Sequence, residues 1–116
     1  MANHTHNRSE EEIVANILVV ILDRARKTRI MYRTNLSSAL TGKYLHKLQG
    51  CGLIQYDEEA KEYLLTNSGR RYLDLYAEYK VIKGKLVSHI SLLEEKRDIL
   101  TQMLTARRRE PLEIIS

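Results

Sequence analysis

Residues 27–49 read KTRIMYRTNLSSALTGKYLHKLQ, and this stretch decides the fold. Thr28 can cap a short helix over residues 29–34, and Ser37 can cap a longer helix that reaches about residue 49. Only two residues, which form a turn, lie between the short helix and Ser37. Two helices joined so tightly are typical of a helix-turn-helix unit.

A longer helix is predicted before this unit. Ser9-x-x-Glu12 is a capping box, in which a hydroxyl and a carboxylate satisfy backbone N–H groups at a helix start. Apolar residues then recur at helical spacing: Ile13, Val14, Ile17, Leu18, Ile21 and Leu22. We expect a helix from about Glu10 to Arg26, with acids in the first turn and bases in the last, as the helix dipole favours.

A hairpin is predicted after the unit. Gly50 and Gly52 can end the preceding helix, because glycine adopts the left-handed conformation found at helix C-termini. Two short apolar runs, 53–56 and 62–65, then flank the polar residues 57–61. The order of elements predicts a mainly α protein with a small β-hairpin, arranged as a winged helix-turn-helix domain and followed by a long helix.

The long helix, which Thr66 can cap, carries a coiled-coil pattern. Apolar residues recur every seven residues, with a companion position three residues on and a further apolar seam beside them. His89 and Lys96 interrupt the companion position, as polar residues that fix register do. The predicted dimer interface consists of Tyr72, Leu75, Tyr76, Tyr79, Ile82, Leu86, His89, Ile90, Leu93, Leu100, Met103 and Leu104.

A partner helix is expected to cover this stripe. About forty residues extend roughly 60 Å, which is far beyond what one small domain can cover. The alternative is that Gly84 breaks the helix and the second half folds back. Glycine costs only about 1 kcal/mol in a helix interior, and the seven-residue spacing continues across Gly84. A dimer is therefore the better interpretation.

Basic charge is concentrated in the helix-turn-helix region. The chain has a net charge of +4, yet no acidic residue occurs from Arg24 through Tyr56. Such a region is either a solvated basic face or a surface that neutralises phosphates, and its place in a recognition motif favours the second. The predicted DNA-binding residues are Lys27, Arg29, Arg33, Ser37, Ser38, Ala39, Gly42, Lys43, His46, Lys47 and Lys61.

The third helix has two dissimilar sides on a helical wheel. Leu40, Tyr44 and Leu48 share one side, with Leu45 at its edge, and we expect this side to face the core. Ala39 and Gly42 lie on the opposite side, where small residues would let the backbone approach a major groove closely. The neighbouring lysines would reach phosphates or guanine edges.

The remaining DNA-contact predictions concern the second helix and the hairpin. Arg29 and Arg33 are one helical turn apart, so both can face phosphates. Lys61 sits at the hairpin tip beside three acids, so we expect the wing to contact only the backbone of the duplex.

Several classes of protein are excluded. The 116 residues and 13.5 kDa suit one domain, and no apolar run or signal peptide suggests a membrane or export. The single cysteine, Cys51, is predicted to be a small core residue in a reducing compartment. No glycine-rich phosphate loop, zinc-protease motif or nucleophile elbow occurs. His4 and His6 are expected in a disordered tail rather than in a metal site. Together, these observations predict a cytoplasmic protein that is not an enzyme and has no cofactor, metal or small-molecule substrate.

The chain resembles a known family. The resemblance rests on Lys27–Tyr32, Asn35–Ser37, Leu40–Tyr44 and Tyr63-x-Leu65-Thr66-x-x-Gly69. These motifs are similar to those of the ten-kilodalton winged-helix DNA-binding proteins of Sulfolobus and related archaea, over roughly residues 10–104. The resemblance implies sequence-tolerant binding to double-stranded DNA, in chromatin organisation or transcriptional control. It also implies a homodimer whose long helices pair antiparallel. Extra residues at both ends, including Arg107–Arg109, depart from the family pattern.

These observations give a predicted domain organisation. Residues 9–66 form the DNA-binding domain, residues 67–108 form the dimerisation helix, and residues 1–8 and 109–116 are flexible tails. A nucleoid-associated location follows from this function. Two other functions stay open: a winged-helix module that binds another protein, and an RNA-binding protein, because phosphate attraction is common to both nucleic acids.

Overall fold

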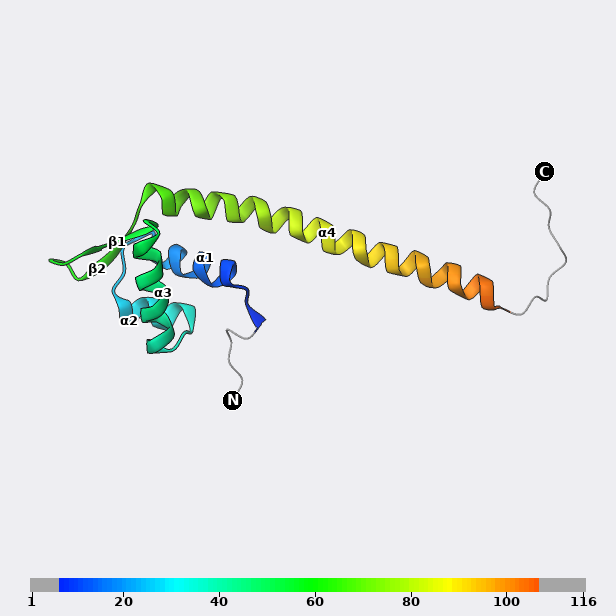
Figure 1. Ribbon diagram of the computed structural model, residues 1–116, viewed down its shortest axis with the longest axis horizontal. Coiled ribbons are helices and arrows are strands. Elements are labelled where there is room, and N and C mark those ends of the chain that lie inside the picture. The colour runs from blue at the N-terminus through cyan, green and yellow to red at the C-terminus, as the bar shows by residue number, and fades with distance from the viewer. Residues whose placement is uncertain (1–6, 107–116) are drawn as a thin grey trace. The chain divides into compact units, whose positions relative to one another are not determined.

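The computed structural model describes residues 7–106. Its elements, shown in Figure 1, are α1 (Glu10–Ile21), α2 (Lys27–Thr34), α3 (Ser38–Gly50), β1 (Ile54–Asp57), β2 (Glu62–Leu65) and α4 (Asn67–Thr105). This confirms the predicted fold, a mainly helical winged helix-turn-helix arrangement with one hairpin and a long final helix. The chain forms two compact units, one ending at Lys80 and one beginning at Val81. We call the described part of the first unit, residues 7–80, the head.

The core of the head is built around α1. Ile17, Leu18 and Ile21 are fully buried, because their i, i+3, i+4 spacing puts them on one side of the helix. Around them pack Ile30 from α2 and Ile54 from β1, with further apolar residues from α3. The hydrophobic stripe predicted for the first helix is therefore the centre of the fold.

The first helix is shorter than predicted, ending at Ile21 rather than near Arg26. Its start is as expected, since the Ser9 hydroxyl accepts a hydrogen bond from the backbone N–H of Glu12 at 3.3 Å. The backbone then turns through Arg24, whose φ is 61°. Ala25 exchanges two backbone hydrogen bonds with Tyr63, at 3.2 and 2.7 Å. Pairing with the hairpin thus replaces the last predicted turns, and no basic residue lies at the C-terminal end of α1.

The two helices of the helix-turn-helix unit start differently. The Ser37 hydroxyl accepts a hydrogen bond from the backbone N–H of Leu40 at 3.1 Å, which confirms this predicted cap. The prediction that Thr28 caps the preceding helix is wrong, because α2 begins at Lys27 and Arg26 occupies the cap position without a side-chain bond. Asn35, with φ 58°, ends α2 in the left-handed conformation.

The segment between α3 and the hairpin contains one correction. Gly52 adopts a φ of 78° and ends the helical region as predicted, whereas Gly50 is the last residue of α3. Cys51 is exposed, so its assignment as a core residue was wrong. The strands then pair antiparallel, with Ile54 opposite Leu65.

The first turns of α4 belong to the head. The Thr66 hydroxyl accepts a hydrogen bond from the backbone N–H of Gly69 at 3.0 Å, which confirms this cap. A Cβ on Gly69 would lie 2.3 Å from the carbonyl oxygen of Leu53, so only glycine permits this approach. The Tyr72 hydroxyl donates a hydrogen bond to the carbonyl of Glu11 at 3.0 Å. These contacts attach the start of α4 to the core.

The second unit, as far as it is described, is a single helical segment. α4 runs through Gly84 without interruption, so glycine does not break the helix there. Every side chain from Ala77 to Ala106 is exposed in the single chain. No helix within residues 7–106 has both the length and the apolar character needed to cross a membrane.

Candidate nucleic-acid interface

The buried side of α3 overlaps the one that the helical wheel predicted, but it is centred on other residues. Thr41, Leu45 and Leu48 are buried, whereas Leu40 and Tyr44 are only half-buried. Thr41 can be buried because its hydroxyl donates to a backbone carbonyl one turn earlier, at 2.8 Å. The polar character of threonine concealed this position from a hydrophobic pattern.

The opposite side of α3 is exposed and carries five of the eleven predicted DNA-binding residues. We call this surface the α3 face, and it consists of Ser38, Ala39, Lys43, His46 and Lys47, all exposed. Ser37, also exposed, caps the N-terminal end of the same helix. The face combines a small residue, two lysines and hydrogen-bonding groups, which matches the composition expected of a helix that enters a major groove.

Lys27 and Gly42 lie at one edge of the α3 face. Gly42 is half-buried, and a Cβ on it would lie 3.4 Å from the Nζ atom of Lys27. The ammonium group of Lys27 is therefore held beside α3, although the residue comes from the first turn of α2. This places a third lysine beside α3, at the edge of the face where Gly42 lies.

Lys47, at the other edge, has a partner within the head. Its Nζ atom lies 3.0 Å from a carboxylate oxygen of Glu10. The hydrogen bond that Lys47 donates to this carboxylate raises the pKa of Lys47. Both side chains are exposed, and surface ion pairs of this kind contribute little to stability. A phosphate could therefore replace Glu10 as the partner of Lys47.

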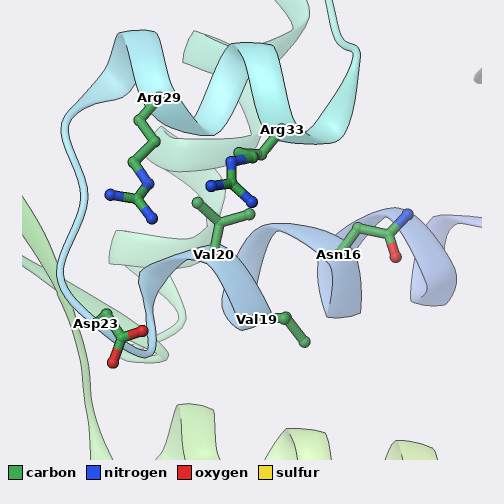
Figure 2. Close-up of a pocket in the computed structure, with 6 residues that line it drawn as sticks. All are labelled: Asn16, Val19, Val20, Asp23, Arg29 and Arg33. Atoms are coloured by element: carbon green, nitrogen blue, oxygen red, sulfur yellow. The ribbon is translucent and has the colours of Figure 1, made fainter.

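Arg29 and Arg33 do not join the α3 face. Figure 2 shows both guanidinium groups extending from α2 toward α1, with Val20 between them. On α2, Arg29 and Arg33 lie about 160° and 120° around the helix from Lys27. They line a cavity together with Asn16, Val19, Val20 and Asp23. The sequence grouped these arginines with the lysines, and the structure puts them on another flank of the head.

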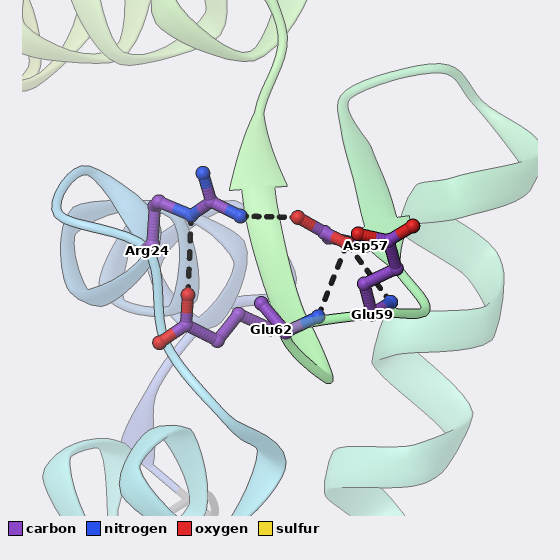
Figure 3. A network of polar contacts seen from close by, with 5 residues as sticks. Arg24, Asp57, Glu59 and Glu62 are labelled. Atoms are coloured by element: carbon purple, nitrogen blue, oxygen red, sulfur yellow. Dashed lines mark hydrogen bonds and ion pairs between the residues drawn. The ribbon is translucent and has the colours of Figure 1, made fainter.

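The wing is fixed by a polar network that the sequence did not predict (Figure 3). Arg24 donates hydrogen bonds to the carboxylates of Asp57 and Glu62, the latter at 3.1 Å. Asp57 also accepts from the backbone N–H groups of Ala60 and Glu59, at 3.2 and 3.0 Å. The bond from Ala60 and the bond from Arg24 are the main reasons why the pKa of Asp57 is lowered. The network ties the hairpin to the segment that follows α1.

The tip of the wing is not basic. Lys61 is exposed and has a φ of 57°. Glu58 and Glu59 are exposed beside it, so their charge opposes that of the lysine. The expected contact of the wing with the backbone of the duplex stays a prediction.

Most of the predictions about the two ends of the chain concern residues that the structure does not describe. His4, His6 and Arg107–Arg109 lie in the ranges 1–6 and 107–116, of which nothing is described. Arg8, expected in a flexible tail, is instead bound to the head, because its Nη1 atom donates to the carbonyl of Thr34 at 3.0 Å. Residues 7–106 contain no group of three or more potential metal ligands.

The predicted dimer-interface residues fall into two groups. Tyr72 and Tyr76 are half-buried, and Tyr72 packs against the core of its own head. The others are exposed, and the largest apolar ones are about half exposed or more: Leu75 52%, Tyr79 45%, Ile82 67%, Leu86 58%, Ile90 45%, Leu93 68%, Leu100 62%, Met103 71% and Leu104 86%. His89 is exposed as well.

Comparison with known proteins places this geometry in a family. A family described as winged helix-turn-helix matches residues 7–84, which is more than half of the chain. An uncharacterised protein of Methanocaldococcus jannaschii is 34% identical over 85 residues, covering 72% of this chain and 86% of the relative. The crystal structure of Sso10a-2, described as a DNA-binding protein from Sulfolobus solfataricus, superposes with a TM-score of 0.70 at 24% identity, over 76% of this chain and 95% of that one. That likeness shows the same fold. The chain belongs to the winged helix-turn-helix family.

Proposed function

We propose that this protein is a homodimer that binds double-stranded DNA through the α3 face and acts in chromatin organisation or transcriptional control. The observation that carries the proposal is the α3 face itself, an exposed helix surface on which a small residue, Ala39, is followed by Lys43 and Lys47 at intervals of four residues. A major groove admits one α-helix, and the phosphates on both sides of it attract cations. A nucleoid-associated location follows.

The residues of the α3 face have distinct proposed roles. Lys27 and Lys43 contact phosphates or guanine edges, and Lys47 exchanges Glu10 for a phosphate. Ser37 and Ser38 lie at the N-terminal end of α3, where backbone N–H groups favour an anion. His46 donates to a base edge or a phosphate. Lys61 makes a peripheral contact from the wing.

Arg29 and Arg33 are left out of this interface. Their guanidinium groups point toward α1, so a duplex held against α3 need not reach them. This assignment provides an internal control. Substituting a lysine of the α3 face should weaken DNA binding, whereas substituting Arg29 or Arg33 should not.

The test is the salt dependence of binding to a labelled duplex, measured by fluorescence anisotropy. Lys43→Ala should weaken binding and reduce the slope of log affinity against log salt by about one unit. Arg33→Ala should leave both unchanged, as should Lys80→Ala on α4. Equal losses in all three variants would mean that binding follows net charge and not the α3 face.

The same titration separates the other candidate functions. A module that binds only another protein would show no retention on any duplex at moderate salt. A protein that prefers RNA would bind an RNA duplex or a single-stranded RNA of equal length more tightly than the DNA duplex. Either result would contradict the proposal. Footprinting would then distinguish coating of DNA from recognition of a few sites.

The proposed dimer rests on α4. Apolar residues such as Leu86, Leu93 and Leu100 are more than half exposed in the single chain, and a second α4 of the same pattern would cover them. The resemblance to the archaeal family favours an antiparallel pair. The polar residue His89 would then lie near the middle of the pair.

Cysteine cross-linking tests the direction of the pair. Cys51 is exposed, so the test starts from Cys51→Ser. In an antiparallel pair, Leu75→Cys and Leu100→Cys should each fail to form a disulfide alone, and mixing the two variants should produce a heterodimeric cross-link. Disulfides within each separate variant would indicate a parallel pair.

A further inference from the structure

The cavity between α1 and α2 lies apart from the α3 face and has a composition of its own. Its volume is about 450 Å³, within the range of small-molecule sites. It is lined by Asn16, Val19, Val20, Asp23, Arg29 and Arg33. Five of the six residues lie on α1 or α2, and Asp23 follows the end of α1. Figure 2 shows the two arginines on the α2 side and the other residues on or just after α1.

The charged groups of this cavity are unpaired. Among residues 7–106 no ion pair joins Arg29, Arg33 or Asp23 to any other residue. Elsewhere on the head, exposed cations do pair with acids within reach, as Arg24 pairs with Asp57. Two guanidinium groups one turn apart, with an acid lining the same cavity, are thus available to a ligand.

The cavity offers charged, apolar and amide groups for contact. Guanidinium groups bind carboxylates and phosphates through parallel hydrogen bonds, and two of them one turn apart can share one oxyanion. Asp23 can accept hydrogen bonds from a cationic or other donor group. Val19, which is 55% exposed, and the half-buried Val20 provide an apolar surface for a short hydrocarbon group. The amide of Asn16 can both donate and accept.

We propose that this cavity, the α1–α2 site, binds a small zwitterionic molecule with an apolar side chain. The oxyanion lies on Arg29 and Arg33, the ammonium group on Asp23, and the hydrocarbon part on Val19 and Val20. Aliphatic α-amino acids are the simplest molecules with this pattern. The ligand contacts none of the α3 face, so its binding can be measured without DNA.

The charge pattern excludes simpler occupants. An inorganic anion would satisfy the arginines but leave Asp23 and the valines without a partner, and the acid would oppose it. A cation would satisfy Asp23 and be repelled by two guanidinium groups. Only a ligand with both charges uses all three contacts.

The test is isothermal titration calorimetry of the full-length protein with L-leucine and L-valine. Two analogues remove one contact each: leucinamide lacks the carboxylate, and N-acetylleucine lacks the ammonium group. A third probe, inorganic phosphate, lacks both the ammonium group and the apolar part. We expect the amino acids to bind with a dissociation constant on the order of a millimolar or tighter. Each analogue should bind at least about tenfold more weakly, because each loses a charge-assisted or apolar contact.

Variants then localise the binding. Arg29→Gln and Asp23→Asn should each weaken leucine binding about tenfold or more, while Arg71→Gln, an exposed arginine on α4, should not. Circular dichroism checks that each variant is folded, and duplex binding by Arg29→Gln should equal that of the unchanged protein. Phosphate binding as tightly as leucine would overturn the zwitterion assignment. No heat from any amino acid, or equal losses with Arg71→Gln, would overturn the site.

Discussion

α1 and the second half of α4 carry the same kind of sequence pattern and have opposite surroundings. In α1, the apolar residues Ile13, Ile17 and Ile21 are between 0 and 4% exposed. Beyond residue 80, the large apolar residues of α4 are between 45 and 86% exposed. Helical periodicity therefore indicates that a helix has an apolar side, and tertiary structure decides what covers that side.

The difference lies in the neighbours that the chain itself provides. α1 is enclosed by α2, α3 and the hairpin, which supply the rest of the core. The described residues after Lys80 form a single helix, and no other described element belongs to that unit. If the proposed dimer forms, both regions are cores, one within a chain and one between chains. The predictions below separate these two cases.

The largest expected effect concerns the proposed interchain core. Leu86→Lys/Leu93→Lys should convert the dimer to a monomer in sedimentation equilibrium, because each buried leucine contributes about 1.5–3 kcal/mol and each lysine must be desolvated. Duplex affinity should fall more than any single contact explains, since two linked heads bind with a high effective concentration. The head should remain folded.

One observation would contradict that prediction directly. If the unchanged protein sediments as a monomer, the exposed leucines have no partner and the interchain core does not exist. Lys83→Ala and Lys85→Ala, which leave the apolar positions intact, serve as controls and should leave the dimer in place.

A matched pair of isoleucines compares the two regions. Ile17→Ala should lower the free energy of unfolding of the head by about 2–5 kcal/mol, because Ile17 is fully buried and a cavity would remain. Ile82→Ala should leave the head unchanged and weaken only the dimer. Hydrogen exchange followed by mass spectrometry reads the two regions separately. If both variants exchange faster in α1 and α3, the head and the second half of α4 form one cooperative unit.

A matched pair of glycines should give effects of opposite sign. Gly69→Ala places a Cβ 2.3 Å from the Leu53 carbonyl and 2.5 Å from a methyl group of Leu65, so we expect a loss of about 1–3 kcal/mol from the head. Gly84→Ala meets nothing within 4 Å and should stabilise α4 by up to about 1 kcal/mol. Thermal unfolding followed by circular dichroism measures both. A neutral Gly69→Ala would mean that the start of α4 can shift away from the hairpin.

Features that depend on residues close in sequence could be predicted. The caps at Ser9, Ser37 and Thr66 were correct, as was the turn at Gly52, because each depends on a hydrogen bond or a φ angle within three residues. The order of elements followed from these signals together with the apolar periodicity.

Features that depend on distant residues could not be predicted. The end of α1 is set by the pairing of Ala25 with Tyr63, which lies beyond any local signal. Thr41 is buried because its hydroxyl is satisfied, which hydropathy does not record. The two arginines of α2 could have faced DNA or α1, and only the packing of α1 beside α2 decides between these directions. The sequence therefore indicated which residues share the exposed side of α3, but it did not indicate that the arginines of α2 extend toward α1.

The smallest expected effect concerns Tyr72, where the head holds the start of α4. Burial raises the pKa of Tyr72 to about 12 from an ordinary value of 10.0, with the nearby Glu11 carboxylate adding to the shift. A tyrosine that ionises less readily when folded stabilises the fold below pH 10, and this contribution is lost as the pH rises from 10 to 12. Tyr72→Phe should remove this part of the loss of stability at alkaline pH. It should also cost about 0.5–1.5 kcal/mol at neutral pH, because the hydrogen bond to Glu11 is broken. Thermal melting at several pH values measures both effects.

Tyr32→Phe is the control, since Tyr32 is 85% exposed. If Tyr72→Phe melts with the same pH dependence as the unchanged protein, Tyr72 does not hold α4 to the head.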